Sequence, residues 1–397
     1  MSQLRAGVYG MPFEYLGGGQ LLQLLVARAL SRKYQVDLLH HVPGLTADRL
    51  ARDYCVEGDR VALRYVEPVP WQWPYLSPGG TSREPGFAEH RRLTRDYDLF
   101  VDLVMGPPLR CYARRGVLLV LFPAEGKPQV WPWNEPAGTT PLLKRVVRNA
   151  WYAGRWRRVF ASYDHCISIS EFTARWVRDR WQRESEIIYP LVQASFTPRP
   201  KENLILSVGR FSRRGTRKKQ LEMVQAFARL SGTLPAGWEY LCLGGVANDP
   251  DDQAYFREVA QAAGGYPIRV VANPAGQEVR DAYERAAIFW HAAGLGEDEQ
   301  KEPERAEHFG LSTVEAMAAG CVPVVIRKGG QPEIVEHGIS GYLWETPEQL
   351  GELTRRVATG PALRDQLAGQ ARQRARRFTD PEAFANAVLR AASAAGE

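Results

Sequence analysis

The sequence predicts an α/β protein made of two doubly wound domains, each built on a parallel sheet. The chain has 397 residues, which exceeds a single ordinary core and suits two domains of about 200 residues each. Along both halves, short apolar segments alternate with segments of helical periodicity. This alternation is typical of βαβ units, whose strands run parallel and bind ligands at their carboxyl ends.

The composition indicates a soluble globular protein, with 45% apolar and 24% charged residues. There is no run of about 18 apolar residues, so we expect no transmembrane helix. The chain enters a first strand without the features of a secretory signal, and its five cysteines follow no metal-ligand spacing. We therefore expect a cytoplasmic protein with buried thiols. A net charge of +6 suits anionic ligands, and no nucleic-acid-binding motif is visible.

The first βαβ unit opens the chain. Residues 5–10 read as a strand, 20–34 carry apolar residues at helical spacing, and 35–42 read as a second strand. The loop between them contains the glycine triplet 17–19. Its spacing is not that of a dinucleotide-binding GxGxxG motif, and no acidic residue is placed to hold a ribose. The triplet either faces a ligand or belongs to a loop that needs positive φ.

The first domain continues with more strands and one unusual segment. Further strands are expected at 60–66, 97–104, 116–123, 165–170 and 185–190. Between two of them, residues 141–160 form a basic amphipathic pattern that also contains tryptophan. Such a helix suits the surface of an anionic membrane, where indoles and cations meet the headgroups. The alternative is a domain helix with core aromatics and a solvated basic face, and both interpretations stay open.

The second domain follows a polar, proline-bearing linker at 190–203. Residues 203–211 read as a buried strand that ends at Gly209 and Arg210, and a basic loop then leads into an amphipathic helix. Later strands are expected at 239–246, 268–274, 287–294 and 321–326. These segments complete a second parallel sheet.

The segment 307–341 carries the strongest functional signal. Residues 309–311 read as a tight turn that feeds a helix. A helix start has unpaired N–H groups and partial positive charge, which suit a diphosphate, and Gly310 lets the backbone approach a ligand closely. Glu307 and Glu315 flank this turn as acceptors for sugar hydroxyls. The pattern predicts a nucleotide-sugar site, and the alternative is an ordinary strand–loop–helix with surface carboxylates.

The text EHFGLSTVEAMAAG, followed by GGQPEIV, resembles the signature of the retaining family 4 glycosyltransferases. Members of that family have the GT-B fold, in which two Rossmann-like domains face each other across a cleft. The resemblance implies that Glu307 contacts the donor sugar and that Glu315 binds the ribose. The backbone amides that meet sugar and phosphate would be those of Phe309, Gly310, Leu311, Ser312 and Thr313.

The family also has two cations that bind the donor diphosphate. One is an arginine just after a strand, and the other is a lysine that opens the next helix. Arg210 matches the first and Lys218 the second, while Lys219 is an alternative because the intervening loop is longer than the commonest family form. Two cations neutralise charge that develops on the leaving diphosphate. The alternative interpretation is a surface basic loop.

The resemblance assigns the remaining parts of the site. It places Gly18 and Gly19 near the sugar and phosphates, and the turn after Val271 near the nucleotide base. Family members often have a histidine after a strand of the first domain, and Leu121 stands there in this chain, which puts a catalytic histidine in that strand in doubt. The acidic run 249–252 is assigned no metal, because cations already meet the diphosphate, and no cofactor is expected. Three polar residues remain unassigned: Glu125, His90 and His165.

The expected domains are an acceptor domain at 1–195 and a donor domain at 196–379, with a last helix at about 380–397 packing back on the first domain. The implied reaction moves a sugar, with retention, from a nucleotide-diphosphate sugar to a hydroxyl of a glycan, glycolipid or lipid-linked acceptor. Alternatives are a nucleotide-sugar epimerase of the same fold and a non-catalytic nucleotide-sugar binding protein. The expected location is cytoplasmic, with peripheral contact at the inner membrane face through 141–160 as an option, and no nucleic acid partner is expected.

Overall fold

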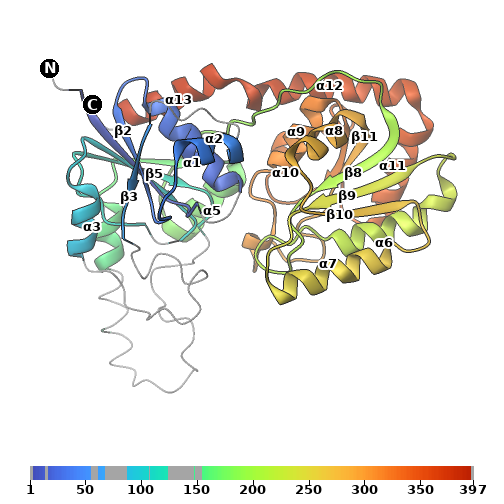
Figure 1. Cartoon of the computed structure of the whole chain (residues 1–397), viewed down its shortest axis with the longest axis horizontal. Coiled ribbons are helices and arrows are strands. Elements are labelled where there is room, and N and C mark those ends of the chain that lie inside the picture. Colours follow the sequence, from blue (N-terminus) through green and yellow to red (C-terminus); the bar gives the residue numbers. More distant parts are fainter. Residues whose placement is uncertain are drawn as a thin grey trace. The chain divides into compact units, whose positions relative to one another are not determined.

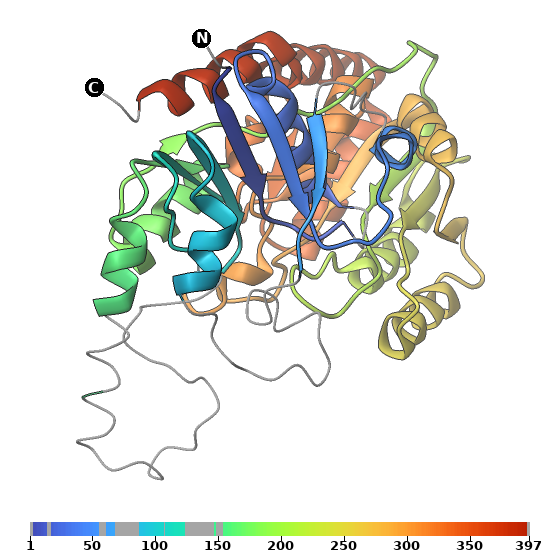
Figure 2. The same cartoon turned by 60° about the vertical axis from the view of Figure 1, so that its left-hand side comes forward.

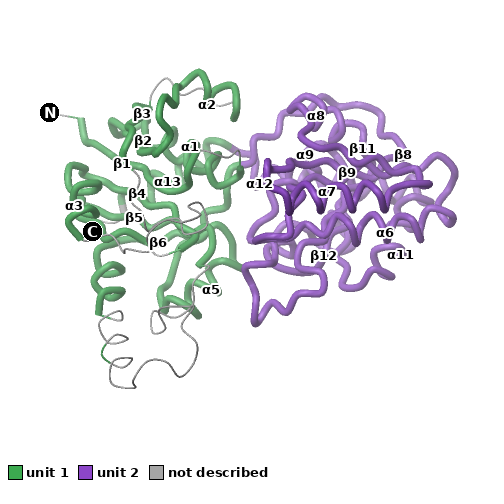
Figure 3. Tube along the Cα trace, turned by 60° about the horizontal axis from the view of Figure 1, so that its bottom comes forward, with its two compact units in different colours: residues 1–191, 381–397 green, residues 192–380 purple. Residues whose placement is uncertain are grey.

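The computed structural model describes residues 3–13, 17–54, 61–67, 87–106, 108–123, 147 and 154–394. The chain divides into two compact units, Met1–Leu191 with Pro381–Glu397, and Val192–Asp380 (Figure 3). The boundary expected from the sequence was 195/196. Each unit holds one sheet in which neighbouring strands pair in parallel.

The first unit is built on a seven-stranded sheet with the order β3-β2-β1-β4-β5-β6-β7 (Figure 2). The strands are β1 (Arg5–Tyr9), β2 (Gln35–His40), β3 (Val61–Tyr65), β4 (Leu99–Val104), β5 (Arg115–Val120), β6 (His165–Ser168) and β7 (Glu186–Ile187). Strand β4 is buried along its whole length, as expected of a parallel sheet covered by helices. The strand order reverses between β1 and β4, which is where a doubly wound sheet has its crevice.

Five helices of the first unit are fully bounded among the described residues. They are α1 (Gly18–Leu30), α2 (Ala47–Tyr54), α3 (Phe87–Thr94), α5 (Glu171–Trp181) and α13 (Pro381–Ala394). Helix α13 comes from the end of the chain and packs against α1 (Figure 1). The guanidinium of Arg32 donates to both carboxylate oxygens of Glu382, at 2.7 and 2.8 Å. The last helix therefore belongs to the first unit.

The basic segment 141–160 lies largely outside the described residues, which include only 147 and 154–160 of it. In the described part, Trp156 stacks on Phe160 with ring centroids 5.0 Å apart, and both contact Trp181. These rings pack against the core of the first unit. For Trp156 the interpretation as a core aromatic is therefore correct.

The second unit has a six-stranded sheet with the order β10-β9-β8-β11-β12-β13. The strands are β8 (Glu202–Val208), β9 (Glu239–Gly244), β10 (Ile268–Ala272), β11 (Ala286–His291), β12 (Val322–Ile326) and β13 (Tyr342–Trp344). The first five confirm the expected strands, and β13 was not predicted. Here the order reverses between β8 and β11.

Helices cover both faces of the second sheet, with α6 and α7 on one face and α8 and α9 on the other (Figure 1). The helices of this unit are α6 (Gln220–Leu230), α7 (Pro250–Ala262), α8 (Gly276–Arg285), α9 (Leu311–Ala319), α10 (Gln331–Ile334), α11 (Pro347–Thr359) and α12 (Pro361–Thr379), with 3-10 turns η1 (Ser231–Thr233) and η2 (Pro303–Arg305). The core contains Trp290, whose indole donates to Thr354 at 3.0 Å and whose ring lies 5.4 Å from that of Tyr240. Helix α12 packs on α9, where Phe378 meets Phe309 at 5.5 Å.

The acidic run 249–252 begins α7. The Asp249 carboxylate accepts from the N–H groups of Asp251 and Asp252, and Pro250 occupies the first turn. Arg214 contacts Asp249 at 3.1 Å and Asp251 at 2.6 Å. Capping and surface ion pairs thus account for this run.

Of the helices that the structure describes, none has the length and apolar character that a membrane crossing requires.

Candidate functional site

The candidate site of the second unit forms where the strand order reverses. Gly209 and Arg210 directly follow β8, and His291 is the last residue of β11, the neighbouring strand. Both strands run parallel, so these residues share the carboxyl edge of the sheet. Ligands of doubly wound sheets bind at this edge, in the crevice at the reversal point.

Two side chains from separate segments, Lys218 and His291, contact the side chain of Glu307. The Lys218 Nζ donates to the Glu307 Oε2, and the His291 Nε2 lies 2.9 Å from the same oxygen. The side chains of His291 and Glu307 are only 3% and 16% exposed, and that of Lys218 is 21% exposed. Lys218 precedes α6, His291 ends β11, and Glu307 precedes α9. The sequence analysis placed Lys218 and Glu307 in one site, and the structure brings them into contact.

The charge states of this cluster follow from its surroundings. Burial alone would raise the pKa of Glu307, but the charge of Lys218 and the hydrogen bond from His291 outweigh it and hold the pKa well below its ordinary value. Burial lowers the pKa of His291, against the opposing effect of Glu307. Glu307 is therefore ionised and His291 neutral. In that state the Nε2–H of His291 donates to Glu307, and among the described residues its Nδ1 has no hydrogen-bond partner.

The two lysines at the start of α6 contact different carboxylates. A Cβ at Gly209 would lie 2.8 Å from the Lys218 Cγ, so the glycine leaves room for that side chain. Lys219, with φ of +59°, points elsewhere, and its Nζ donates to Glu297 at 2.8 Å. Arg210 is exposed, and no carboxylate of the described chain forms an ion pair with it. Lys218 is thus the lysine in contact with Glu307.

Glycines allow two loops to press together under Glu307. Gly329 has φ of +60°, and a Cβ there would lie 2.1 Å from the backbone oxygen of Glu307. The Gly330 N–H donates to that same oxygen at 2.7 Å. The Gly329-Gly330 pair therefore fixes the backbone from which the Glu307 side chain projects.

Helix α9 begins at Leu311 with Gly310 as its N-cap. Gly310 has φ of +126°, which favours glycine, and it offers no side chain to cap the helix. The Thr313 N–H donates to the Gly310 carbonyl at 3.0 Å, whereas the N–H groups of Leu311 and Ser312 have no acceptor among the described residues. An anion at a helix start requires such N–H groups. Phe309 and Thr313 are buried in the core, so their side chains are not available to a ligand.

Glu315 lies inside α9 and behaves differently from Glu307. The Tyr283 hydroxyl donates to its Oε2 at 2.8 Å, and Tyr283 itself packs edge-on against Phe196 at 5.7 Å. Burial raises the pKa of Glu315 to about 7, although the hydrogen bond from Tyr283 opposes the shift. The surroundings therefore lower the pKa of Glu307 and raise that of Glu315.

The turn after β10 is fixed by Asn273. Val271 is half-buried in β10, and the next turn places Asn273 at φ of +49°. The Asn273 Oδ1 accepts from the Val246 N–H at 2.8 Å, which ties this turn to the one after β9. The expected base-binding turn is thus a defined structure at the same edge of the sheet.

In the first unit, Gly18 and Gly19 open helix α1. Gly17 is extended, with φ of −167°, and the next two glycines are helical, so the explanation by positive φ is wrong. A Cβ at Gly19 would lie 3.1 Å from the Leu121 Cδ1 and 3.0 Å from the Met11 Cγ. Close packing of the helix start against the end of β5 accounts for this glycine. Leu121 itself is buried.

The unassigned polar residues have separate positions. His90 is buried in α3, and its Nδ1 accepts from the Arg110 N–H at 2.8 Å. His165 contacts Glu186 at 2.8 Å. Glu125 lies outside the described residues.

Sequence reasoning missed His291 and Tyr283, the partners of the two glutamates. For His291 a signal existed, because it is a polar residue at the carboxyl end of an otherwise apolar strand. For Tyr283 there was none, since its place opposite Glu315 depends on the packing of α8 on α9.

Two doubly wound units, each with one parallel sheet, are the architecture of the GT-B fold. Residues 192–374 match the model of the family described as glycosyl transferases group 1. Human alpha-1,3/1,6-mannosyltransferase ALG2 is 25% identical over 260 residues, which cover 57% of this chain and 57% of that protein. The D-inositol 3-phosphate glycosyltransferase of Nocardioides sp. is 39% identical over 79 residues, covering 19% and 17%. The chain thus spans less than two thirds of the length of these curated relatives.

Solved structures agree on the fold. A glycosyltransferase from Rickettsia africae superposes with a TM-score of 0.70 at 14% identity, covering 100% of this chain and 99% of that one. Anabaena Alr3699/HepE in complex with UDP and glucose superposes with a TM-score of 0.65 at 15% identity, covering 98% and 100%. The expected GT-B fold is confirmed. In sequence, the chain is similar to glycosyltransferases.

Proposed function

We propose that this protein is a retaining glycosyltransferase, of the hexosyltransferase type and similar to family 4, that moves a sugar from a nucleotide-diphosphate sugar to an acceptor hydroxyl. The observation that carries the proposal is the contact of Lys218 and His291 with Glu307 beside the open start of α9. A cation and a helix start suit a diphosphate, while an ionised carboxylate accepts hydrogen bonds from sugar hydroxyls. These groups lie together at the carboxyl edge of the second sheet.

Each part of the donor has a candidate partner. Lys218 and Arg210 would meet the diphosphate, together with the backbone amides of 309–313. Glu307 would hold the sugar, and Glu315 the ribose. The turn after Val271 would hold the base. The glycines of the first unit, Gly18 and Gly19, would lie near the sugar and phosphates.

The chemistry would depend on positioning and charge. The acceptor hydroxyl would attack the anomeric carbon on the face that the diphosphate leaves, and a diphosphate oxygen would take the acceptor proton. The bond to the acceptor oxygen forms on the same face from which the diphosphate departs, so configuration is retained. Lys218 and Arg210 would stabilise the charge on the leaving group, and no metal or other cofactor is then required.

The acceptor in this proposal is a glycan, glycolipid or lipid-linked sugar, and the reaction belongs to glycan biosynthesis in the cytoplasm. The named relatives favour this class, since one is a mannosyltransferase and another structure contains UDP and glucose. Peripheral membrane contact through 141–160 is part of the proposal only as a route to a lipid-linked acceptor.

Two observations keep other functions as candidates. His291 beside Glu307 is an acid–base pair, which a nucleotide-sugar epimerase of this fold requires. Leu121 at the end of β5 favours a nucleotide-sugar binding protein without turnover.

Incubation with a panel of UDP-, GDP- and ADP-sugars, with and without sugar acceptors, separates the three functions. Release of nucleotide diphosphate with a new glycoside of unchanged anomeric configuration supports the transferase. An epimerised donor supports the epimerase, and binding without turnover supports the non-catalytic nucleotide-sugar binding protein.

A further inference from the structure

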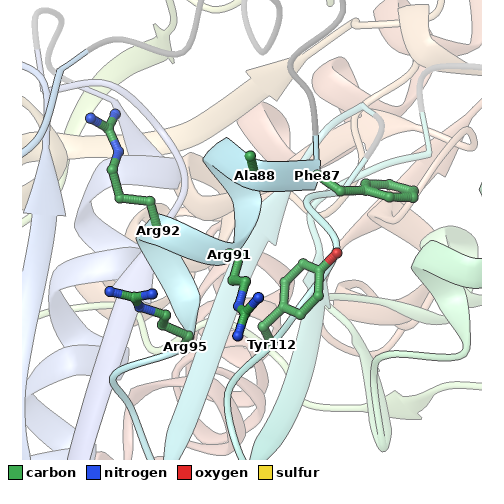
Figure 4. Close-up of a pocket in the computed structure, with 6 residues that line it drawn as sticks. All are labelled: Phe87, Ala88, Arg91, Arg92, Arg95 and Tyr112. Carbon is green, nitrogen blue, oxygen red and sulfur yellow. The ribbon is translucent and has the colours of Figure 1, made fainter.

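A second charged site lies in the first unit, along helix α3. A cavity of about 450 Å³ opens there, and its size is within the range of small-molecule sites. The residues that line this α3 pocket are Phe87, Ala88, Arg91, Arg92, Arg95 and Tyr112 (Figure 4). None of them takes part in the proposed donor site, so the two sites are independent.

The lining of the α3 pocket concentrates positive charge. Arg91 and Arg92 lie in the last turn of α3, and Arg95 directly follows the helix. All three are exposed. Within the described residues, Arg91 and Arg92 form no ion pair, and Arg95 contacts its neighbour Asp96 at 3.3 Å. Exposed cations with so little neutralisation beside a cavity suit an anionic ligand.

Two more arginines lie beside the pocket, each held by an aromatic ring. The guanidinium carbons of Arg110 and Arg155 lie 4.9 and 4.3 Å from the ring centroid of Phe87. Arg110 is also 4.9 Å from the ring of Tyr112. These cation–π contacts fix both cations next to the three that line the cavity.

A buried histidine lies on the same helix. His90 is 1% exposed on α3, and its Nδ1 accepts from the backbone N–H of Arg110. Burial, together with the charges of Arg155 and Arg110, lowers the pKa of His90 to about 4. His90 is therefore neutral at physiological pH, and it adds no charge of its own beneath the arginines.

We propose that the α3 pocket binds the phosphate group of an anionic ligand, which is either a phospholipid headgroup or a free phosphate ester. Guanidinium groups offer forked donors that match pairs of phosphate oxygens, and three of them line this cavity. The Phe87 ring and the Tyr112 ring supply apolar contact for carbon atoms next to the phosphate, and the Tyr112 hydroxyl adds a polar group at the rim (Figure 4).

The test uses the full chain with Lys218→Gln/Arg210→Gln, which removes both cations that are assigned to the donor diphosphate. In this background, Arg91→Gln/Arg92→Gln is compared with Arg257→Gln/Arg376→Gln, which removes the same charge from exposed positions of the second unit. Because Arg91 and Arg92 are exposed, thermal unfolding should be the same in both variants.

Calorimetry with glycerol 3-phosphate measures the free ester at low salt, and co-sedimentation with phosphatidylcholine vesicles, with or without phosphatidic acid, measures the headgroup. We expect the pocket variant to bind about tenfold more weakly or worse, and the control variant to bind as the parent does. Binding to the ester identifies a soluble ligand, and binding only to vesicles with phosphatidic acid identifies a lipid. Equal binding by pocket and control variants, or no binding to either probe, overturns the proposal.

Discussion

Lys218 and Glu307, 89 positions apart in the chain, form an ion pair at the reversal point of the second sheet. The pair brings the loop before α6 and the turn before α9 to one place. A buried carboxylate needs a partner, and Lys218 supplies it. In the proposed reaction the same cation turns to the donor diphosphate, which links charge neutralisation of Glu307 to donor binding.

Replacing Glu307 by Gln should abolish sugar transfer while leaving the protein folded. The side chain contacts Lys218 and His291 rather than the apolar core. Glutamine keeps one acceptor oxygen but loses the negative charge that strengthens hydrogen bonds from the sugar hydroxyls. We expect turnover to fall by at least about a hundredfold, the scale seen when one electrostatic contact to a transition state is lost. Nucleotide diphosphate release measures this. Glu352→Gln, an exposed change on α11, is the matched control, and near-normal turnover in Glu307→Gln would rule out the assigned role.

Substitutions of the three cations before α6 should differ in how much they weaken donor binding. Lys218→Gln and Arg210→Gln should each weaken calorimetric binding of the nucleotide diphosphate by about tenfold or more, because each loses a charged contact to phosphate. Lys219→Gln should have a smaller effect, since that side chain is engaged by Glu297. If Lys219→Gln proves the most damaging of the three, the assignment to Lys218 is wrong.

The free energy of unfolding should depend on pH through the protonation of Glu315. Its pKa is raised to about 7 in the folded protein, so the folded state holds a proton that the unfolded chain releases at lower pH. The stability this contributes is complete below the unfolded pKa and is lost as pH rises through about 7.

Urea unfolding of the ligand-free protein at pH 5, 6, 7 and 8 measures this pH dependence against Glu315→Gln. The free energy of unfolding of the wild type should fall relative to the variant by up to about 3 kcal/mol across this interval. Parallel curves for the two proteins would show that Glu315 is already ionised at pH 5.

The glycine pair should be needed for the geometry of Glu307. Gly329→Ala places a methyl group 2.1 Å from the Glu307 backbone oxygen at a positive φ, so the loop must move. Gly338→Ala is a matched control, because Gly338 has φ of +80° but no atom within 4 Å of an added Cβ. The control should lose about 1–2 kcal/mol of unfolding free energy, because alanine is strained at positive φ, and it should keep its turnover.

Gly329→Ala should lose about 1–3 kcal/mol more through overpacking, and it should also lose turnover. Urea unfolding and donor turnover of both variants are the measurements. Equal stability and equal turnover in the two variants would show that Gly329 does not shape the site.

Much of the fold was predictable because buried parallel strands leave a clear sequence pattern. Strands such as β8 and β11 are apolar runs bounded by turn residues. Strand β13 was missed because three residues are too few to show periodicity. The glycine triplet was located correctly, but the contact of Gly19 with Leu121 could not be predicted, because it depends on tertiary packing.

The site was predictable only in part. Glu307, Gly310 and Glu315 lie within one continuous motif, so the sequence shows them together. The choice between Lys218 and Lys219 depended on how a long loop enters α6, and only the structure separates the two directions. His291 reaches Glu307 because β11 pairs with β8, a relationship between distant segments that local patterns do not contain.

The central claim is that the reversal point of the second sheet binds a nucleotide-diphosphate sugar. A crystal structure of the protein with such a donor, taken from the panel that supports turnover, tests it most directly. The account predicts the diphosphate within hydrogen-bond distance of Lys218 and Arg210 at the start of α9, with Glu307 on the sugar and Glu315 on the ribose. A donor bound away from β8 and β11, with the Lys218–Glu307 pair intact and untouched, would contradict it.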